Sequence, residues 1–192
     1  MRETIRNSAI KIYSFLFRYP EEKHVEYVLN GQLEELFQLS VSSKNPMFQK
    51  YQSWRDVHFN APQSLLETLQ VDYTRLFITA YPNVLAPPYV SYYKERSLMG
   101  QVSSSILDIY HQHGFEVNDA NSEMPDHIST VLEFLYRLLE TGEGDRQAHK
   151  FYISYLKWWL PQWEDKIKKH AETPFYPLAA SALVKFLAKE IS

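Results

Sequence analysis

Apolar residues recur along most of this chain at spacings of three and four, which is the pattern of helices that bury one side. The stretch 124–135 shows the pattern most clearly, because Ile128, Val131 and Leu135 follow the i, i+3, i+7 spacing. Strand signals are weak, since no alternating run of β-branched residues is bounded by hairpin turns. The sequence therefore predicts an all-α protein.

Prolines set most of the expected helix ends, because proline cannot continue a helix interior. They also forbid a regular helix between residues 80 and 97, where Pro87-Pro88 favours an extended segment. We expect a single-domain helical bundle over residues 1–192 with about eight helices and a Pro-rich loop at about 80–97. The expected helices cover about residues 5–16, 24–39, 46–58, 62–79, 98–113, 125–142, 145–170 (with a kink at Pro161) and 174–188.

The composition excludes several classes of protein. With 192 residues, 45% of them hydrophobic, the chain can bury a sizeable core. The net charge of −3 and the absence of a dense Lys/Arg stripe argue against nucleic-acid binding. The absence of cysteine excludes disulfides and thiolate metal sites. Because neither a secretory h-region nor an apolar run of about 18 residues is present, we expect a cytoplasmic protein with no membrane insertion.

A polar stripe accompanies the apolar side of the helix expected at Pro125. Pro125 suits the first helical position, and the Asp126 carboxylate would lie in the positive field of the helix N-terminus. Thr130, Glu133 and Arg137 follow at helical intervals and would share a face with Asp126. Two interpretations stay open. The two carboxylates receive cationic side chains of a ligand, or the face is solvated and Glu133 pairs with Arg137, which the spacing alone favours.

Two segments before this helix contain residues that suggest a role beyond packing. One is the run 72–77, Asp-Tyr-Thr-Arg-Leu-Phe, and the other is the run 86–93, Ala-Pro-Pro-Tyr-Val-Ser-Tyr-Tyr. A rigid Pro-Pro segment flanked by tyrosines would suit an extended peptide. The alternative, equally compatible with the residues, is a packed loop that uses its tyrosines as plugs.

Catalytic and metal sites have little support in the sequence. Asp126, His127 and Glu133 offer one imidazole and two carboxylates, a weak metal set without a second histidine. His111 and His113 are two residues apart and would point in different directions on a helix. We therefore predict no catalytic residue, no bound metal and no cofactor. The alternative is a helical metal-dependent hydrolase built on Asp126, His127 and Glu133.

Several motifs resemble those of the TorD/DmsD/NarJ family, in the order and separations typical of that family. They are Glu67-x4-Asp72-Tyr-x-Arg-Leu-Phe77, Ala86-Pro-Pro-Tyr89, Gly100 at a helix start, Pro125-Asp-His-Ile128, Trp158-Trp159 and Pro174-Phe-Tyr176. The match covers essentially the whole chain.

The resemblance implies a cytoplasmic, all-helical chaperone, rather than an enzyme, for molybdenum enzymes of the dimethyl-sulfoxide-reductase type. Such chaperones bind the twin-arginine signal or N-terminal peptide of a client oxidoreductase and hold the client back from export. They also help the client receive its molybdopterin cofactor. Some members form dimers by exchanging helical segments, so we expect a monomer, with a domain-swapped homodimer as the alternative.

A twin-arginine peptide offers two guanidinium groups and an apolar segment. The guanidinium groups require carboxylates in a partly desolvated cleft, and the apolar segment requires aromatic side chains. His127 would donate to a peptide carbonyl or cap the neighbouring loop, and both roles stay open. The residues expected to bind the peptide are Asp126, His127, Glu123, Pro125, Glu133, Tyr89, Pro87, Pro88, Tyr92, Tyr93 and Phe134.

Overall fold

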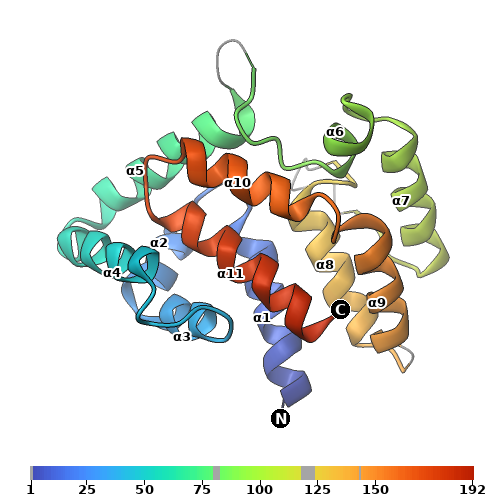
Figure 1. Cartoon of the computed structure of the whole chain (residues 1–192), viewed down its shortest axis with the longest axis horizontal. Helices are drawn as coiled ribbons and strands as arrows, with labels where there is room; N and C mark the ends of the chain where they lie inside the picture. The colour runs from blue at the N-terminus through green and yellow to red at the C-terminus, as the bar shows by residue number, and fades with distance from the viewer. Residues whose placement is uncertain (1, 80–82, 118–123, 143) are drawn as a thin grey trace. The chain divides into compact units, whose positions relative to one another are not determined.

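The computed structural model describes residues 2–79, 83–117, 124–142 and 144–192, and over these residues it is helical (Figure 1). The only strand-like pairing among them is an isolated bridge. The all-α prediction is confirmed, but the described residues form eleven α-helices rather than about eight. No helix in this part of the chain is long and apolar enough to cross a membrane. The elements are α1 (Arg2–Leu16), α2 (Glu22–Leu29), α3 (Gln32–Gln38), α4 (Pro46–His58), α5 (Pro62–Tyr73), a π-helical turn η1 (Thr74–Ile78), α6 (Val90–Glu95), α7 (Gln101–Gln112), α8 (Ile128–Leu139), α9 (Gly144–Tyr155), α10 (Leu160–His170) and α11 (Phe175–Glu190).

Three differences from the expected helices account for the larger number. The segment 24–39 divides into α2 and α3 at Gly31, whose φ of +80° is a left-handed conformation that ends a helix. The segment 145–170 divides into α9 and α10, and Pro161 lies in the first turn of α10, where its missing N–H costs nothing. The Pro-rich loop contains α6, because Val90 and the residues after it follow the last proline of that loop.

The described chain divides into two compact units. Unit 1 comprises Met1–Arg18, Pro88–Leu160 and Ile191–Ser192, and therefore contains α1 and α6 to α9. Unit 2 comprises Tyr19–Pro87 and Pro161–Glu190, and contains α2 to α5, η1, most of α10 and α11. A single domain over the whole chain stays a prediction.

In unit 1, α8 is the central helix. It packs against both α1 and α9, while α6 packs against α7. The hydroxyl of Ser14 on α1 donates to the carbonyl oxygen of Ser129 on α8 at 2.9 Å. The expected apolar stripe is confirmed, and all of its members are buried: Ile128, Val131, Leu132, Leu135, Leu138 and Leu139.

In unit 2, the motif that begins at Asp72 fixes the connection between α10 and α11. The Asp72 carboxylate accepts hydrogen bonds from the backbone N–H of Glu172 at 3.1 Å and of Thr173 at 2.9 Å. The Thr173 hydroxyl donates to the same carboxylate at 2.8 Å. Arg75 adds a hydrogen bond to the carbonyl oxygen of His170 and an ion pair with Glu172 at 3.2 Å. The polar residues of this motif therefore act within the fold of unit 2.

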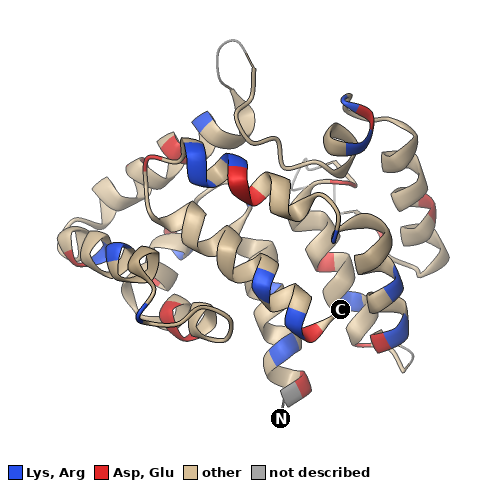
Figure 2. Ribbon diagram, viewed as in Figure 1, with Lys and Arg blue, Asp and Glu red and all other residues tan. Residues whose placement is uncertain are grey.

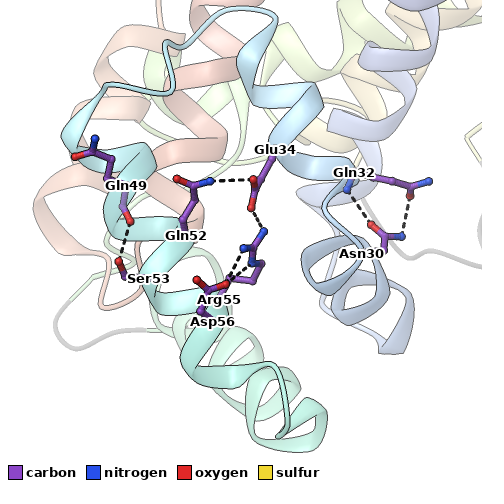
Figure 3. A network of polar contacts seen from close by, with 8 residues as sticks. All are labelled: Asn30, Gln32, Glu34, Gln49, Gln52, Ser53, Arg55 and Asp56. Carbon is purple, nitrogen blue, oxygen red and sulfur yellow. Dashed lines mark hydrogen bonds and ion pairs between the residues drawn. The ribbon is translucent and has the colours of Figure 1, made fainter.

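A second polar network in unit 2 joins α3 to α4 (Figure 3). Glu34 on α3 forms an ion pair with Arg55 on α4, and its other oxygen accepts a hydrogen bond from the Gln52 amide at 3.0 Å. Arg55 also pairs with Asp56 at 2.7 Å. Because the Glu34 and Arg55 side chains are mostly buried, their pairing compensates the loss of water that each charge suffers.

The start of α9 lies against the end of α8, and Gly144 makes this approach possible. A Cβ at Gly144 would overlap the carbonyl oxygen of Leu138 and lie 2.8 Å from the Cα of Leu139. Because both are backbone atoms, we expect Gly144→Ala to lower the free energy of unfolding by about 1–3 kcal/mol. Gly142→Ala is the matched control, since a Cβ there meets nothing within 4 Å, and it should change stability by less than about 0.5 kcal/mol. Urea denaturation followed by circular dichroism compares the two, and equal losses would contradict the close approach.

Candidate functional site

The turn before α8 and the segment before α6 pair with each other in unit 1. Tyr89 and His127 form the isolated antiparallel bridge. The backbone N–H of Val90 donates to the carbonyl oxygen of Asp126 at 3.1 Å, and that of Ile128 donates to the carbonyl oxygen of Pro88 at 2.8 Å. The rings of Tyr89 and His127 meet edge to face, with centroids 5.2 Å apart. These contacts fix the end of the Pro-rich segment to the turn.

Asp126 is the centre of this junction. Its carboxylate is fully buried, at 0% exposure, and accepts a hydrogen bond from the backbone N–H of Ser91 at 2.8 Å. The hydroxyl of Ser103 donates to its other oxygen at 3.1 Å. A buried carboxylate needs such donors, because it has lost its water. Asp126 therefore connects the turn before α8 to the first turn of α6 and to α7.

The position of Asp126 corrects the expected helix start. Pro125 was expected at the first helical position, with Asp126 and Glu133 on one helical face, and this is wrong. The helix α8 begins at Ile128, so Asp126 precedes it. The backbone of residues 125–127 is held in the turn by the Tyr89–His127 bridge, and it cannot be helical at the same time.

His127 caps α8. Its Nδ1 accepts a hydrogen bond from the backbone N–H of Ser129 at 3.3 Å and lies 2.7 Å from the Ser129 hydroxyl. Burial, followed by the charge of Arg18, lowers the pKa of His127 from its ordinary value of 6.5 to about 3. The ring is therefore neutral at physiological pH. His127 thus caps the helix that follows it rather than the neighbouring loop, and its donation to a peptide carbonyl stays a prediction.

Glu133 pairs with Arg18, just beyond the end of α1, and not with Arg137. The guanidinium of Arg18 lies 2.7 Å from Glu133 Oε2, and the two side chains are 31% and 37% exposed. The expected helical pair of Glu133 with Arg137 is wrong, because α1 packs along α8 and brings a better-placed cation. Glu133 therefore presents a half-exposed carboxylate that already binds a guanidinium.

The aromatic residues divide into surface and core. Tyr89, Tyr92 and Tyr93 are half-buried, and the ring of Tyr93 stacks on Trp159 with centroids 5.0 Å apart. Phe134 is fully buried in the core of unit 1, because α8 is covered on more than one side by its neighbours. Phe134 therefore presents no surface to a ligand in this structure.

Tyr110 supports the turn from α7. Its hydroxyl donates to the carbonyl oxygen of Pro125 at 2.8 Å. Burial, and then the nearby carboxylates of Asp126 and Glu133, raise the pKa of Tyr110 well above its usual value. The hydroxyl thus stays protonated and remains a donor.

The residues expected at the site separate by exposure. Pro88, Asp126 and His127 are buried and hold the junction together, whereas Tyr89, Tyr92, Tyr93, Pro125 and Glu133 are half-buried. Pro87 is buried and belongs to unit 2, and Glu123 lies outside the described residues. A peptide-binding role for any of these residues stays a prediction.

Three residues of the site were not predicted from the sequence, namely Ser91, Ser103 and Arg18. Ser103 is buried, and its hydroxyl donates to Asp126. The sequence contains one indication that Ser103 is buried: on a helical wheel, Ser103 lies on the side of α7 that contains Val102 and Ile106, which are both buried. Arg18 had no local signal, because its partner is 115 residues away in the chain.

The metal-site alternative has no assembled ligands. In the described part of the chain, no three His, Asp or Glu side chains lie close enough together to hold a metal ion. Asp126 accepts from Ser91 and Ser103, and Glu133 is paired with Arg18, so the two carboxylates serve different partners. The hydrolase interpretation is not favoured.

Comparisons with known proteins find one matching family and several similar chaperones. A model of the nitrate reductase delta subunit family matches residues 43–170, more than half of the chain. The chaperone protein TorD of Actinobacillus pleuropneumoniae is 28% identical over 125 residues, which is 65% of this chain and 62% of that relative. The match thus spans less than two thirds of the length of that relative. The chaperone protein TorD of Histophilus somni is 26% identical over 179 residues, covering 93% of this chain and 81% of the relative.

One solved structure matches nearly the whole chain. It is the crystal structure of a candidate redox enzyme maturation protein from Archaeoglobus fulgidus, which is 29% identical with a TM-score of 0.62. The match covers 98% of this chain and 94% of that chain.

Replacing the Asp126 carboxylate should destabilise the protein. In Asp126→Asn an amide N–H₂ replaces one acceptor oxygen and faces the Ser91 N–H or the Ser103 hydroxyl. We expect the free energy of unfolding to fall by about 1.5–3 kcal/mol in denaturant titrations. Asp108→Asn, an exposed site on α7, is the control and should change stability by less than about 0.5 kcal/mol. Two variants of equal stability would show that the buried hydrogen bonds contribute nothing.

His127 should make stability depend on pH. The imidazole titrates near 6.5 in the unfolded chain, and its pKa in the folded protein is about 3. Protons therefore favour the unfolded chain below pH 6.5, so the stabilisation is fully present above this pH and is lost as the pH falls towards 3. Between pH 8 and pH 5 the unmodified protein should lose about 2 kcal/mol more than His127→Asn, which keeps a capping acceptor but does not titrate. Identical pH profiles would mean that His127 has the same pKa in the folded and the unfolded chain.

Proposed function

Because this chain belongs to the nitrate reductase delta subunit family, we propose that it is a maturation chaperone for a molybdopterin-containing oxidoreductase. Its named relatives are TorD chaperones, and the similar solved structure is described as a candidate redox enzyme maturation protein. The chaperone acts in the cytoplasm as a monomer and is not an enzyme. It binds the twin-arginine signal or N-terminal peptide of its client, assists cofactor insertion and assembly, and delays export.

The ion pair of Arg18 with Glu133 is the observation that carries the peptide-binding part of this proposal. Glu133 holds a guanidinium at 2.7 Å while both side chains remain about one third exposed. A half-exposed ion pair contributes only about 0–1 kcal/mol, so an arginine of a client peptide can replace Arg18 at little cost. A planar guanidinium suits a carboxylate better than an ammonium does, because it donates two parallel hydrogen bonds.

Half-buried tyrosines supply the apolar contacts in the proposal. Tyr89 immediately precedes α6, and Tyr92 lies within this helix. A tyrosine ring combines apolar area with a polar hydroxyl end. The Asp126 carboxylate and the bridge to His127 hold this segment in place before any peptide arrives. A surface that is fixed in advance loses less conformational entropy on binding.

The test measures binding of a labelled peptide that carries an Arg-Arg pair followed by an apolar segment. Glu133→Gln should weaken binding by about three- to tenfold, because one charge-assisted hydrogen-bonded pair is lost. Arg18→Ala should not weaken binding and should strengthen it by up to about fivefold, because it removes the competing guanidinium. Glu140→Gln, at the exposed end of the same helix, is the matched control and should leave the affinity unchanged. Titration calorimetry measures all four proteins.

A Lys-Lys peptide provides the second arm of the experiment. It should bind the unmodified protein more weakly, since an ammonium cannot form the bidentate contact. The losses from Glu133→Gln and from the lysine peptide should combine less than additively, because both remove the same contact. Additive losses, or weaker binding by Arg18→Ala, would place the arginine contact elsewhere on the protein.

A further inference from the structure

A groove of about 740 Å³ lies between α7, α8 and α9 in unit 1. Ile109 and Gln112 of α7 form one wall, α9 forms the other, and Leu138 of α8 contributes to the floor. The volume is within the range of about 300–1,000 Å³ that is common for ligand sites. The α6 tyrosines and the Arg18–Glu133 pair are not among the described residues that line this groove, so it is separate from the proposed client-peptide surface.

The charges around the groove are positive. Arg146 and Lys150 line it from successive turns of α9, where the basic residues appear in blue in Figure 2. No Asp or Glu is among its described lining residues, although the chain as a whole has a net charge of −3. The nearest carboxylate along α9, Asp145, is paired with Arg6 of α1 at 2.6 Å and lines a second hollow, which Arg146 also borders. Among the described lining residues, an anionic ligand therefore meets cationic side chains and no carboxylate.

The groove changes from charged to aromatic along α9. Phe151 and Tyr155 line it beyond Lys150, with their ring centroids 5.1 Å apart. From Arg146 to Tyr155 the helix rises about 13 Å at 1.5 Å per residue. An extended peptide covers that distance with about four residues at roughly 3.3 Å each. The lining thus matches a short segment with carboxylates at one end and an apolar side chain at the other.

We propose that the groove between α7 and α9 binds a short acidic peptide segment of a partner protein. Its carboxylates lie at Arg146 and Lys150, and its apolar side chain packs on the Tyr155 ring. The side-chain amides of Gln112 and Gln147 also line the groove and can donate to the peptide backbone. A peptide rich in arginine is repelled by the same cations, so this segment is distinct from a twin-arginine signal.

Fluorescence anisotropy on the whole chain tests the proposal. The probe is a labelled peptide with the core Glu-Glu-Ser-Phe, and the matched probe has Gln-Gln-Ser-Phe. The glutamate peptide should bind at least about fivefold more tightly at low salt, and the difference should shrink as salt is added. Equal binding of the two probes, or no binding of either, would overturn the proposal.

Charge reversal at the groove gives the decisive comparison. Lys150→Glu should weaken binding of the glutamate peptide by about five- to tenfold, whereas Lys157→Glu, an exposed lysine beyond α9, should not. A peptide with Lys-Lys-Ser-Phe should prefer Lys150→Glu to the unmodified protein, which a loss of folding cannot produce. Tyr155→Ala should weaken the glutamate and glutamine peptides alike. Equal effects of the two lysine variants would show that only the general charge of the protein attracts the probe, and this would refute a site in the groove.

Discussion

The buried carboxylate of Asp126 is the contact on which the arrangement of unit 1 depends. Taking a carboxylate out of water costs several kcal/mol unless donors replace the lost hydration. The N–H of Ser91 and the hydroxyl of Ser103 replace it here, and these groups belong to α6 and α7. One side chain in the turn before α8 therefore determines where two other helices attach. The tyrosines of α6 are held on the surface of unit 1 by this contact.

A buried carboxylate also joins distant segments of the chain in unit 2. The Asp72 carboxylate accepts from the backbone of Glu172 and Thr173 and fixes the corner between α10 and α11. In both units the aspartate of a family motif serves the fold, and it does so by accepting hydrogen bonds from backbone segments distant in the sequence. The half-exposed Glu133 is different, because its partner Arg18 is a flexible side chain that another guanidinium can replace. The motifs thus form a framework, and the proposed binding surface is built on it.

Under the two proposals, unit 1 presents charges of opposite sign at two places. Glu133 accepts a cation, whereas Arg146 and Lys150 attract an anion. The carboxylate attracts the arginine-bearing peptide and repels the acidic segment, and the cations of the groove do the reverse. The two ligands therefore do not compete for one site. A chaperone arranged in this way can hold an arginine-bearing peptide and contact an acidic segment of a partner at the same time.

The helical class, the apolar stripe of α8 and the family could all be predicted from the amino-acid sequence, because apolar periodicity and ordered motifs are local properties of the chain. The match to the nitrate reductase delta subunit family confirms the resemblance, and Tyr89, Pro88, Asp126 and His127 do lie together. Three features are visible only in the folded structure: Asp126 is buried in the turn before α8, Glu133 pairs with Arg18, and Phe134 belongs to the core. The reason is physical: each outcome depends on a donor, a cation or a packing helix that is distant in the chain, and local spacing contains no information about such partners.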